Sequence, residues 1–267
     1  MPRKVAIIAG EGALPVELAR RLAERGARPL VLSLREGAEA LAPFADAVVP
    51  LRAPSLDEGA RAMEAWGAEA VTMAGHVPKR LIYRPSALLD PLTRSVLARC
   101  LKDDHSLLGA VVEALEARGL RVVPYHQIVP ELLAAEGTLG SRTPRPGERA
   151  DVERGRDVLR VTLPCSFGQA VVVAGGAVVA VEAMEGTDAM IARAGELAGR
   201  GVVVKMMRTD QDPRYDLPTV GPATIEGMAR AGLTCLAVEA GRSLVLSPQE
   251  TIDAADRAGV AVVGIAP

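Results

Sequence analysis

Short apolar runs alternate with amphipathic stretches along the first half of the chain. Each run is rich in Val, Ile, Leu and Ala and is bounded by Gly, Pro or polar residues, which is typical of buried strands. The stretches between the runs repeat apolar residues at helical spacing, which predicts a parallel sheet covered by helices. The predicted strands are 5–9, 29–34, 46–50, 70–74 and 121–124, and the predicted helices are 14–25, one beginning after Ser55, and 104–118.

The pattern changes after about residue 130. The segments EGTLG and TPRPG, within 136–147, predict a loop or linker that divides the chain into domains 1–132 and 133–267. Beyond it, Gly175 and Gly176 separate two apolar runs, which predicts a tight hairpin. The predicted helices here are 148–160, 187–198, 222–231 and 248–258, with Thr187 and Ser247 as N-caps, and the predicted strands are 170–173, 177–181, 202–207, 234–239, 243–246 and 260–265.

These patterns predict an α/β protein. Its N-terminal domain is a Rossmann-like parallel sheet, and its C-terminal domain is an α/β unit with a mixed sheet.

Composition narrows the class of protein. The 267 residues are 49% hydrophobic but only 2% aromatic, so aliphatic side chains must fill the core. The net charge of −2, without a basic run, argues against nucleic acid as a partner. Three scattered cysteines indicate neither a disulfide framework nor a zinc site. Since no apolar run reaches the roughly 20 residues of a membrane span, a cytoplasmic protein is expected.

The sequence lacks the motifs of several common enzymes that act on phosphate or acyl groups. It contains no GxxxxGK[ST] P-loop and no GxSxG nucleophile elbow. The three histidines are too few for a dinuclear metallophosphatase. The turn Gly10-Glu11-Gly12-Ala13-Leu14 resembles half of a dinucleotide fingerprint, but Pro15 replaces its third glycine.

That glycine turn and the end of the fourth predicted strand are the candidate sites of the first domain. Backbone N–H groups at Gly10, Gly12, Ala13 and Leu14 could bind a phosphate. A tight turn that needs glycine for backbone reasons is the alternative. The fourth strand ends in AGHVPK, which places Gly75, His76 and Lys79 at the carboxyl edge of the sheet, where His76 could meet an anion or be structural.

The second domain offers a denser set of polar residues. The predicted strand 177–181 leads into Glu182 and Glu185, and the following helix begins with Thr187 and Asp188. A helix start offers free N–H groups, so a phosphate, or a metal attached to one, could bind there. Thr187 could equally be only the cap of this helix.

The loop QDPRYDLPTVGP combines charge with stiffness. The strand 202–207 delivers Lys205 and Arg208 into it, and prolines fix the frame that carries the alternating charges. Carboxylates bind Mg²⁺ or Mn²⁺, while Lys and Arg neutralise phosphate oxygens, so the mixture suits phosphoryl chemistry. The candidate residues of this loop and of the next strand end are Gln211, Asp212, Arg214, Asp216, Thr219 and Glu239.

Taken together, the segments resemble the UDP-2,3-diacylglucosamine pyrophosphatases of the LpxI type, from lipid A biosynthesis. The resemblance is carried by IIAGEGALPVELA, AGHVPK, KDDHSLL and EGTLG, and above all by GQAVVVAGGAVVAVEAMEGTDAMI, QDPRYDLPTVGP and VEAGRSLVL. It covers nearly the whole chain.

The resemblance implies a divalent-metal-dependent hydrolase that cleaves UDP-2,3-diacylglucosamine, a lipid-linked sugar nucleotide, into UMP and 2,3-diacylglucosamine 1-phosphate. It also implies that the substrate binds in a ligand cleft between the two domains, and that the enzyme is a homodimer that contacts the cytoplasmic face of the inner membrane transiently. By position in the motif, the key aspartate of the family falls on Asp216. We expect Asp216, Asp188 and Glu185 to hold Mg²⁺ or Mn²⁺, and Lys205 and Arg214 to stabilise the transition state.

Two other classes of function remain open at this point. A non-enzymatic module could bind a nucleotide or sugar nucleotide, with Asp216 only ordering its loop. An NAD-dependent enzyme would use the glycine turn, and it predicts quenching of nicotinamide fluorescence on titration.

Overall fold

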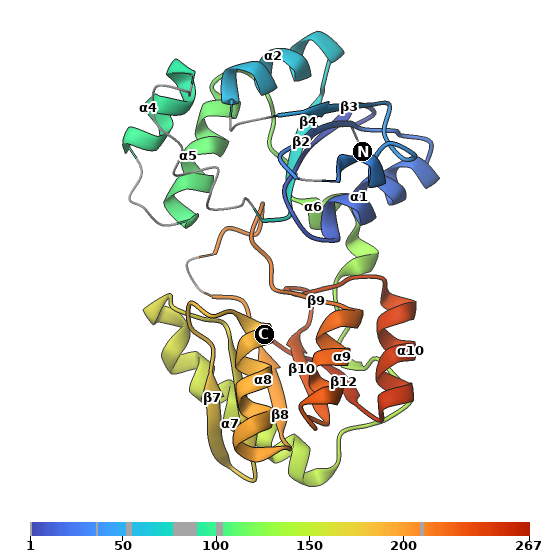
Figure 1. The fold of residues 1–267 in the computed structure, drawn as a ribbon, viewed down its shortest axis with the longest axis vertical. Coiled ribbons are helices and arrows are strands. Elements are labelled where there is room, and N and C mark those ends of the chain that lie inside the picture. The colour runs from blue at the N-terminus through green and yellow to red at the C-terminus, as the bar shows by residue number, and fades with distance from the viewer. Residues whose placement is uncertain (1, 36, 52–54, 77–89, 100–103, 209–210) are drawn as a thin grey trace. The chain divides into compact units, whose positions relative to one another are not determined.

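The computed structural model describes residues 2–35, 37–51, 55–76, 90–99, 104–208 and 211–267 (Figure 1). The chain forms two compact units. The N-terminal unit is Met1–Pro130 together with the short segment Asp212–Tyr215, and the C-terminal unit is Glu131–Gln211 together with Asp216–Pro267. The segment 212–215 therefore folds onto a unit from which it is distant in sequence.

The N-terminal unit is built on a four-stranded sheet of order β3-β2-β1-β4, with every pair of neighbours parallel. The strands are β1 (Val5–Ala9), β2 (Leu30–Ser33), β3 (Ala47–Pro50) and β4 (Ala70–Ala74). The helices are α1 (Leu14–Glu24), α2 (Leu56–Trp66), α4 (Pro91–Arg99), α5 (Asp104–Glu116) and the single turn α6 (Tyr125–Ile128), with a 3-10 turn at Ala38–Ala40. The predicted parallel sheet is confirmed.

Two local predictions for this unit have different outcomes. Ser55 caps α2 as expected, because its Oγ accepts the Glu58 N–H at 3.4 Å. The predicted strand 121–124 is wrong, since only Val122 forms a bridge, parallel to Val71. Pro124 has no N–H with which to continue the ladder, and it leads directly into α6.

The glycine turn after β1 meets the end of β4 at very short range. Glu11 and His76 form an antiparallel bridge, with each N–H donating to the other's carbonyl, at 2.8 Å from Glu11 and 3.0 Å from His76. A Cβ on Gly10 would lie 2.5 Å from the His76 carbonyl oxygen, and one on Gly75 would lie 2.4 Å from that of Glu11. These glycines are therefore needed for the close approach of two backbones.

Replacing Gly10 with alanine is expected to lower the free energy of unfolding by about 2 kcal/mol or more, because the new methyl group would collide with backbone that cannot move aside. Thermal unfolding would measure this. Gly147→Ala is the matched control, since nothing lies within 4 Å of a Cβ at that position. Equal melting temperatures for the two variants would contradict the close-approach argument.

The C-terminal unit is built on a six-stranded sheet of order β5-β12-β10-β8-β6-β7. The strands β8, β10 and β12 are parallel, whereas β5, β6 and β7 are antiparallel to their neighbours, so the predicted mixed sheet is confirmed. The strands are β5 (Gly137–Thr138), β6 (Ala170–Ala174), β7 (Ala177–Val181), β8 (Val202–Lys205), β10 (Cys235–Glu239) and β12 (Ala261–Ile265), and a separate parallel pair is formed by β9 (Thr219–Val220) and β11 (Leu244–Val245).

Helices cover both faces of this sheet (Figure 1). On one face lie α8 (Thr187–Ala198), α9 (Pro222–Arg230) and α10 (Pro248–Ala258), and on the other lies α7 (Pro146–Thr162). Alternate residues of β6 serve the two sides, with Val172 in the core under the three helices and Val171 in the core under α7. Short 3-10 turns occur at Pro130–Leu132 and Leu163–Cys165.

Three expectations for the C-terminal unit are corrected. EGTLG is not simply a linker, because Gly137–Thr138 pairs with β12 at the edge of the sheet. Ser247 precedes α10, but its side chain makes no capping hydrogen bond and its backbone is left-handed, with φ of 40°. The cap of α8 is Gly186, with φ of 82°, and the Thr187 hydroxyl is directed elsewhere.

No helix in the described part of the chain is long and apolar enough to span a membrane.

Candidate functional site

A buried lysine lies at the carboxyl end of β8 in the C-terminal unit. Lys205 is only 6% exposed, and its Nζ donates to the Thr187 Oγ1 and to the Thr219 carbonyl oxygen, both at 3.1 Å. Burial lowers the pKa of Lys205, and the carboxylates of Glu182, Asp188 and Asp216 oppose that shift. The ammonium group is thus held where desolvation makes its charge costly, among carboxylates that favour it.

The Thr187 hydroxyl joins this lysine to a buried carboxylate. Thr187 Oγ1 donates to Glu182 Oε1 at 2.6 Å, while Glu182 Oε2 accepts the Gln169 N–H at 2.9 Å. The loop that carries Gln169 can approach Glu182 because Gly168 has no Cβ. A Cβ at that position would lie 2.1 Å from the Glu182 carbonyl oxygen. The chain of contacts from Lys205 through Thr187 to Glu182 fixes the lysine rotamer.

Replacing Thr187 with valine should therefore lower both the free energy of unfolding and the anion affinity of this site. The change keeps the shape of the side chain but leaves Glu182 and Lys205 without a shared hydroxyl, which costs about 1–3 kcal/mol for buried polar groups. Chemical denaturation and phosphate titration would measure the two effects. Thr187→Ser retains the hydroxyl, and a Ser variant as damaged as the Val variant would contradict this account.

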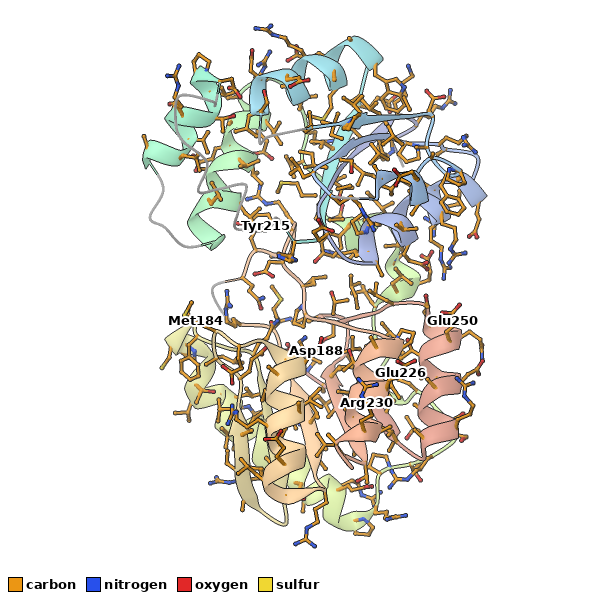
Figure 2. The ribbon with its side chains drawn as sticks, viewed as in Figure 1. Met184, Asp188, Tyr215, Glu226, Arg230 and Glu250 are labelled. Carbon is orange, nitrogen blue, oxygen red and sulfur yellow. The ribbon has the colours of Figure 1, made fainter. Side chains whose placement is uncertain are left out.

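The beginning of α8 adds a second anion-binding element beside Lys205. Asp188 lies at this end of the helix (Figure 2), and Gly186 supplies no side chain to cap it. The first N–H groups of a helix lack partners within the helix and carry partial positive charge. Phosphate oxygens are the ligands that such N–H groups bind most readily.

Asp216 and Arg208 extend the site along the loop. Arg208 Nη2 lies 3.8 Å from Asp216 Oδ2, and the Asp216 side chain is 36% exposed. A carboxylate with this exposure is open to water and to ligand. The cluster of Lys205, Asp188, Asp216 and Arg208 with the start of α8 thus combines positive donors with two carboxylates.

This arrangement suits the binding of a phosphate group. A lysine ammonium has three N–H donors, and two of those on Lys205 are engaged by Thr187 and Thr219. The third donor, the open helix start and the Arg208 guanidinium could share one anion. The two aspartates could hold a cation or orient a water molecule against that anion.

The predicted trio of metal-binding carboxylates is not gathered. Glu185 Oε1 accepts a hydrogen bond from Arg193 Nη2 at 2.7 Å. The pKa of Glu185 is lowered by its own backbone N–H and by Arg193. Among the described residues no group of three or more His, Cys, Asp or Glu side chains is close enough to hold a metal ion. Of the trio, only Asp188 and Asp216 are near Lys205.

Arg214 is held within the N-terminal unit. Its Nε and Nη2 donate to Asp212 Oδ2 at 2.9 and 2.7 Å, and its Nη1 lies 3.4 Å from Glu116 Oε1 on α5. The hydrogen bond to Asp212 raises the pKa of Arg214. To stabilise the transition state as predicted, Arg214 would first have to release the Asp212 carboxylate.

Three other candidate residues have structural contacts that account for them. Gln211 is buried, and its amide accepts the Arg208 N–H at 2.6 Å and donates to Gln169 Oε1 at 3.1 Å. Thr219 supplies its carbonyl to Lys205. Glu239 Oε2 accepts the Met207 N–H at 2.9 Å, so this carboxylate shapes the beginning of the loop after β8.

The glycine turn of the N-terminal unit offers fewer donors than expected. The N–H of Gly10 donates to the Ala74 carbonyl at 2.8 Å, and that of Glu11 to His76. Neither can therefore bind a phosphate without breaking the bridge, so the structural interpretation of this turn holds for Gly10. Gly10 and Leu14 are buried, whereas Gly12, Ala13, Gly75 and His76 are exposed. Lys79 lies outside the described residues.

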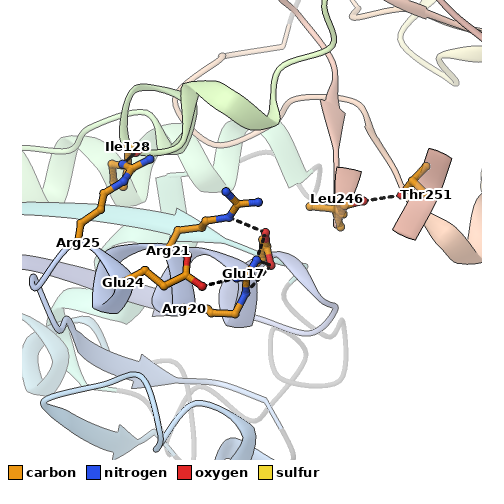
Figure 3. Close-up of polar contacts among 8 residues, drawn as sticks. All are labelled: Glu17, Arg20, Arg21, Glu24, Arg25, Ile128, Leu246 and Thr251. Atoms are coloured by element: carbon orange, nitrogen blue, oxygen red, sulfur yellow. Dashed lines mark hydrogen bonds and ion pairs between the residues drawn. The ribbon is translucent and has the colours of Figure 1, made fainter. Parts of the chain in front are cut away.

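Charges on α1 satisfy one another. The Glu17 carboxylate is buried, and it accepts hydrogen bonds from Arg20 Nη2 at 2.8 Å and from Arg21 Nε at 3.0 Å (Figure 3). Arg20 also contacts Glu24, and Arg25 donates to the Ile128 carbonyl. These contacts explain the polar face of the helix without a ligand.

Sequence reasoning missed three residues that shape the site. Glu182 and Arg208 were noticed in the sequence but were not assigned a role, and Gln169 was not considered. The signal for Glu182 was its position one residue after a strand and five before Thr187. Only the antiparallel pairing of β6 with β8 brings Gln169 beside the end of β8.

Comparison with known proteins gives matches over both units. Residues 4–132 match the family described as the LpxI N-terminal domain, and residues 135–263 match the LpxI C-terminal domain. A curated relative, the UDP-2,3-diacylglucosamine pyrophosphatase LpxI of Caulobacter vibrioides, is 38% identical over 283 residues. The alignment covers 99% of this chain and 98% of the relative.

Proposed function

This chain belongs to the LpxI family, and on that premise we propose that it hydrolyses the pyrophosphate bond of UDP-2,3-diacylglucosamine. The products are UMP and 2,3-diacylglucosamine 1-phosphate, in lipid A biosynthesis. The observation that carries the proposal is the buried Lys205, which uses two of its three donors on other described residues, beside the start of α8 and two aspartates.

The chemistry required of these residues is charge stabilisation. A water oxygen bonds to one phosphorus, the anhydride P–O bond breaks, the leaving phosphate takes the electron pair, and one proton passes to solvent. Lys205, Arg208 and the N–H groups of α8 face the negative charge that develops on the phosphate oxygens. Asp216, partly exposed, orients the attacking water and accepts its proton.

We also propose that the reaction depends on Mg²⁺ or Mn²⁺. The three predicted carboxylates do not together form a metal site, because Glu185 accepts a hydrogen bond from Arg193. The pair Asp188 and Asp216 does fit, because Mg²⁺ is usually bound by one or two carboxylates together with substrate phosphate oxygens. Such an ion would neutralise charge on the diphosphate.

Exposed apolar side chains beside the site support transient contact with the inner membrane. Phe167 is 43% exposed and Met184 is 91% exposed. Their loops touch through Gly168 and Glu182, and Figure 2 places Met184 at the same end of the unit as Asp188. A lipid-bearing substrate resides in a bilayer, so an apolar tip near the site would favour its extraction.

The proposed compartment is the cytoplasm, at the face of the inner membrane. Cys165 and Cys235 are free thiols, as is usual for proteins of a reducing compartment. The homodimer is proposed on the family resemblance alone. Light scattering on the purified protein would test it, with an expected mass of twice 27.9 kDa.

The proposed function is tested by incubating the purified chain with UDP-2,3-diacylglucosamine and Mg²⁺ in detergent micelles. UMP and diacylglucosamine 1-phosphate should appear in equal amounts, and chelation of the metal should stop the reaction. UDP-N-acetylglucosamine, which lacks the two acyl chains, serves as the control for substrate class. Binding of the substrate without release of UMP would indicate a non-enzymatic module that binds a sugar nucleotide.

A further inference from the structure

An apolar cavity lies within the N-terminal unit, and Gly10 of the glycine turn and Gly75 at the end of β4 form part of its wall. It is bounded by one face of the parallel sheet and by α2, α4 and α5, and the volume that water-sized molecules can enter is about 100 Å³. Few voids in a core packed to crystal density are larger than a single water molecule, so a space of this volume is unusual there.

The floor of the cavity follows from strand register. Ile8 of β1 is the neighbour of both Leu32 of β2 and Met73 of β4, so the three side chains lie on one face of the sheet. Across from them, Met63 of α2 and Val111 of α5 also line the space. Ser55 and Thr93 are polar exceptions in an otherwise almost wholly apolar lining.

We propose that this cavity binds a fatty acyl chain of the substrate. The inference rests on the proposed function and assigns the lipid part of the same substrate. An aliphatic wall with very few hydrogen-bonding groups can recognise only a hydrocarbon, since any polar ligand would lose its hydrogen bonds to water on entry. The burial of methylene groups supplies the affinity.

A residue from the loop after β8 forms part of the cavity wall. Tyr215 lines the cavity and belongs to the segment 212–215 that packs on the N-terminal unit. Its side chain also contacts α5, where a Cβ on Gly109 would lie 3.6 Å from the Tyr215 hydroxyl. The next residue in the sequence is Asp216, which belongs to the polar site of the C-terminal unit. The substrate of the proposed function carries both a diphosphate and acyl chains.

The half-buried position Val111 allows a test by filling the cavity. Val111→Trp should lower kcat/KM for the tetradecanoyl form of UDP-2,3-diacylglucosamine by about tenfold or more, because exclusion of two or three methylene groups is enough for that factor. The butanoyl form should be cleaved as by the unaltered protein. Glu113→Trp, on the exposed side of the same helix, is the control and should leave both substrates unaffected.

A second measurement needs no variant. The unaltered protein is photo-crosslinked to UDP-2,3-diacylglucosamine that carries a diazirine at the end of one acyl chain, and the labelled peptides are mapped. We expect labels in α2, α4 or α5. Labels confined to other peptides would overturn the acyl assignment, as would equal loss of both substrates in a folded Val111→Trp variant. If the unaltered protein released no UMP from either substrate, the proposed function would fail instead.

Discussion

Lys205→Met is expected to lower kcat/KM for pyrophosphate cleavage by about 10²- to 10³-fold, the usual effect of removing one preorganised donor from a charged transition state. Methionine has nearly the shape of the lysine stem, without the terminal nitrogen, and so supplies no N–H and no charge. The variant should remain folded, because burying a thioether costs less than burying an ammonium group. The rate of UMP release measures the effect.

Lys4→Met is the control for this substitution. Lys4 is a surface residue whose Nζ donates to the Trp66 carbonyl at 2.8 Å in the N-terminal unit, so its loss should not change UMP release. A Lys205→Met variant as active as Lys4→Met would remove Lys205 from the mechanism.

The pKa of Lys205 adds a pH dependence to the same prediction. Burial lowers the pKa below the ordinary value of 10.5, so the charged form is lost at a lower pH than in a free lysine. If the charged form is the active one, kcat/KM falls as the pH rises through that lowered pKa. Stability changes in the opposite sense, because the unfolded chain then binds more protons than the folded one and the free energy of unfolding rises. Lys205→Met should abolish both trends.

Asp216→Asn should lower kcat by about 10²- to 10⁴-fold, as expected for the loss of a general base. Asparagine has the same shape but cannot accept the proton of the attacking water. If Asp216 also holds the metal, the Mg²⁺ concentration that gives half of the maximal rate should rise as well.

Asp157→Asn is the matched control for Asp216→Asn. Asp157 lies on the surface of α7, 62% exposed and 3.5 Å from Arg160, so the substitution should have no effect on UMP release. If the Asp216→Asn variant had an unchanged kcat and an unchanged Mg²⁺ requirement, Asp216 would have no part in catalysis and would only order its loop.

The layers of both units could be predicted from the sequence because strands buried between helices have a nearly uniform apolar signature. The helix α4 was missed, although its start carries a local signal. The Asp90 carboxylate accepts the Thr93 N–H at 2.9 Å, and Pro91 occupies the first helical position. An aspartate before a proline is a usual way to begin a helix.

The candidate site could be predicted only in part, since its contacts depend on tertiary packing. Thr187 has the sequence position of a helix cap, but its hydroxyl binds Glu182 because the end of β8 brings Lys205 against it. Alternating charges in the loop gave no means of telling Arg208 from Arg214. Arg214 binds Asp212 and Glu116 in the N-terminal unit, whereas Arg208 lies beside Asp216.

The central claim is that the diphosphate of the substrate binds at Lys205 and the start of α8. A crystal structure of the Asp216→Asn variant with UDP-2,3-diacylglucosamine tests this most directly. The account predicts a diphosphate oxygen within about 3 Å of the Lys205 Nζ, with further oxygens on the N–H groups at the beginning of α8. A diphosphate bound away from Lys205, with its Nζ still contacting only Thr187 and Thr219, would contradict it.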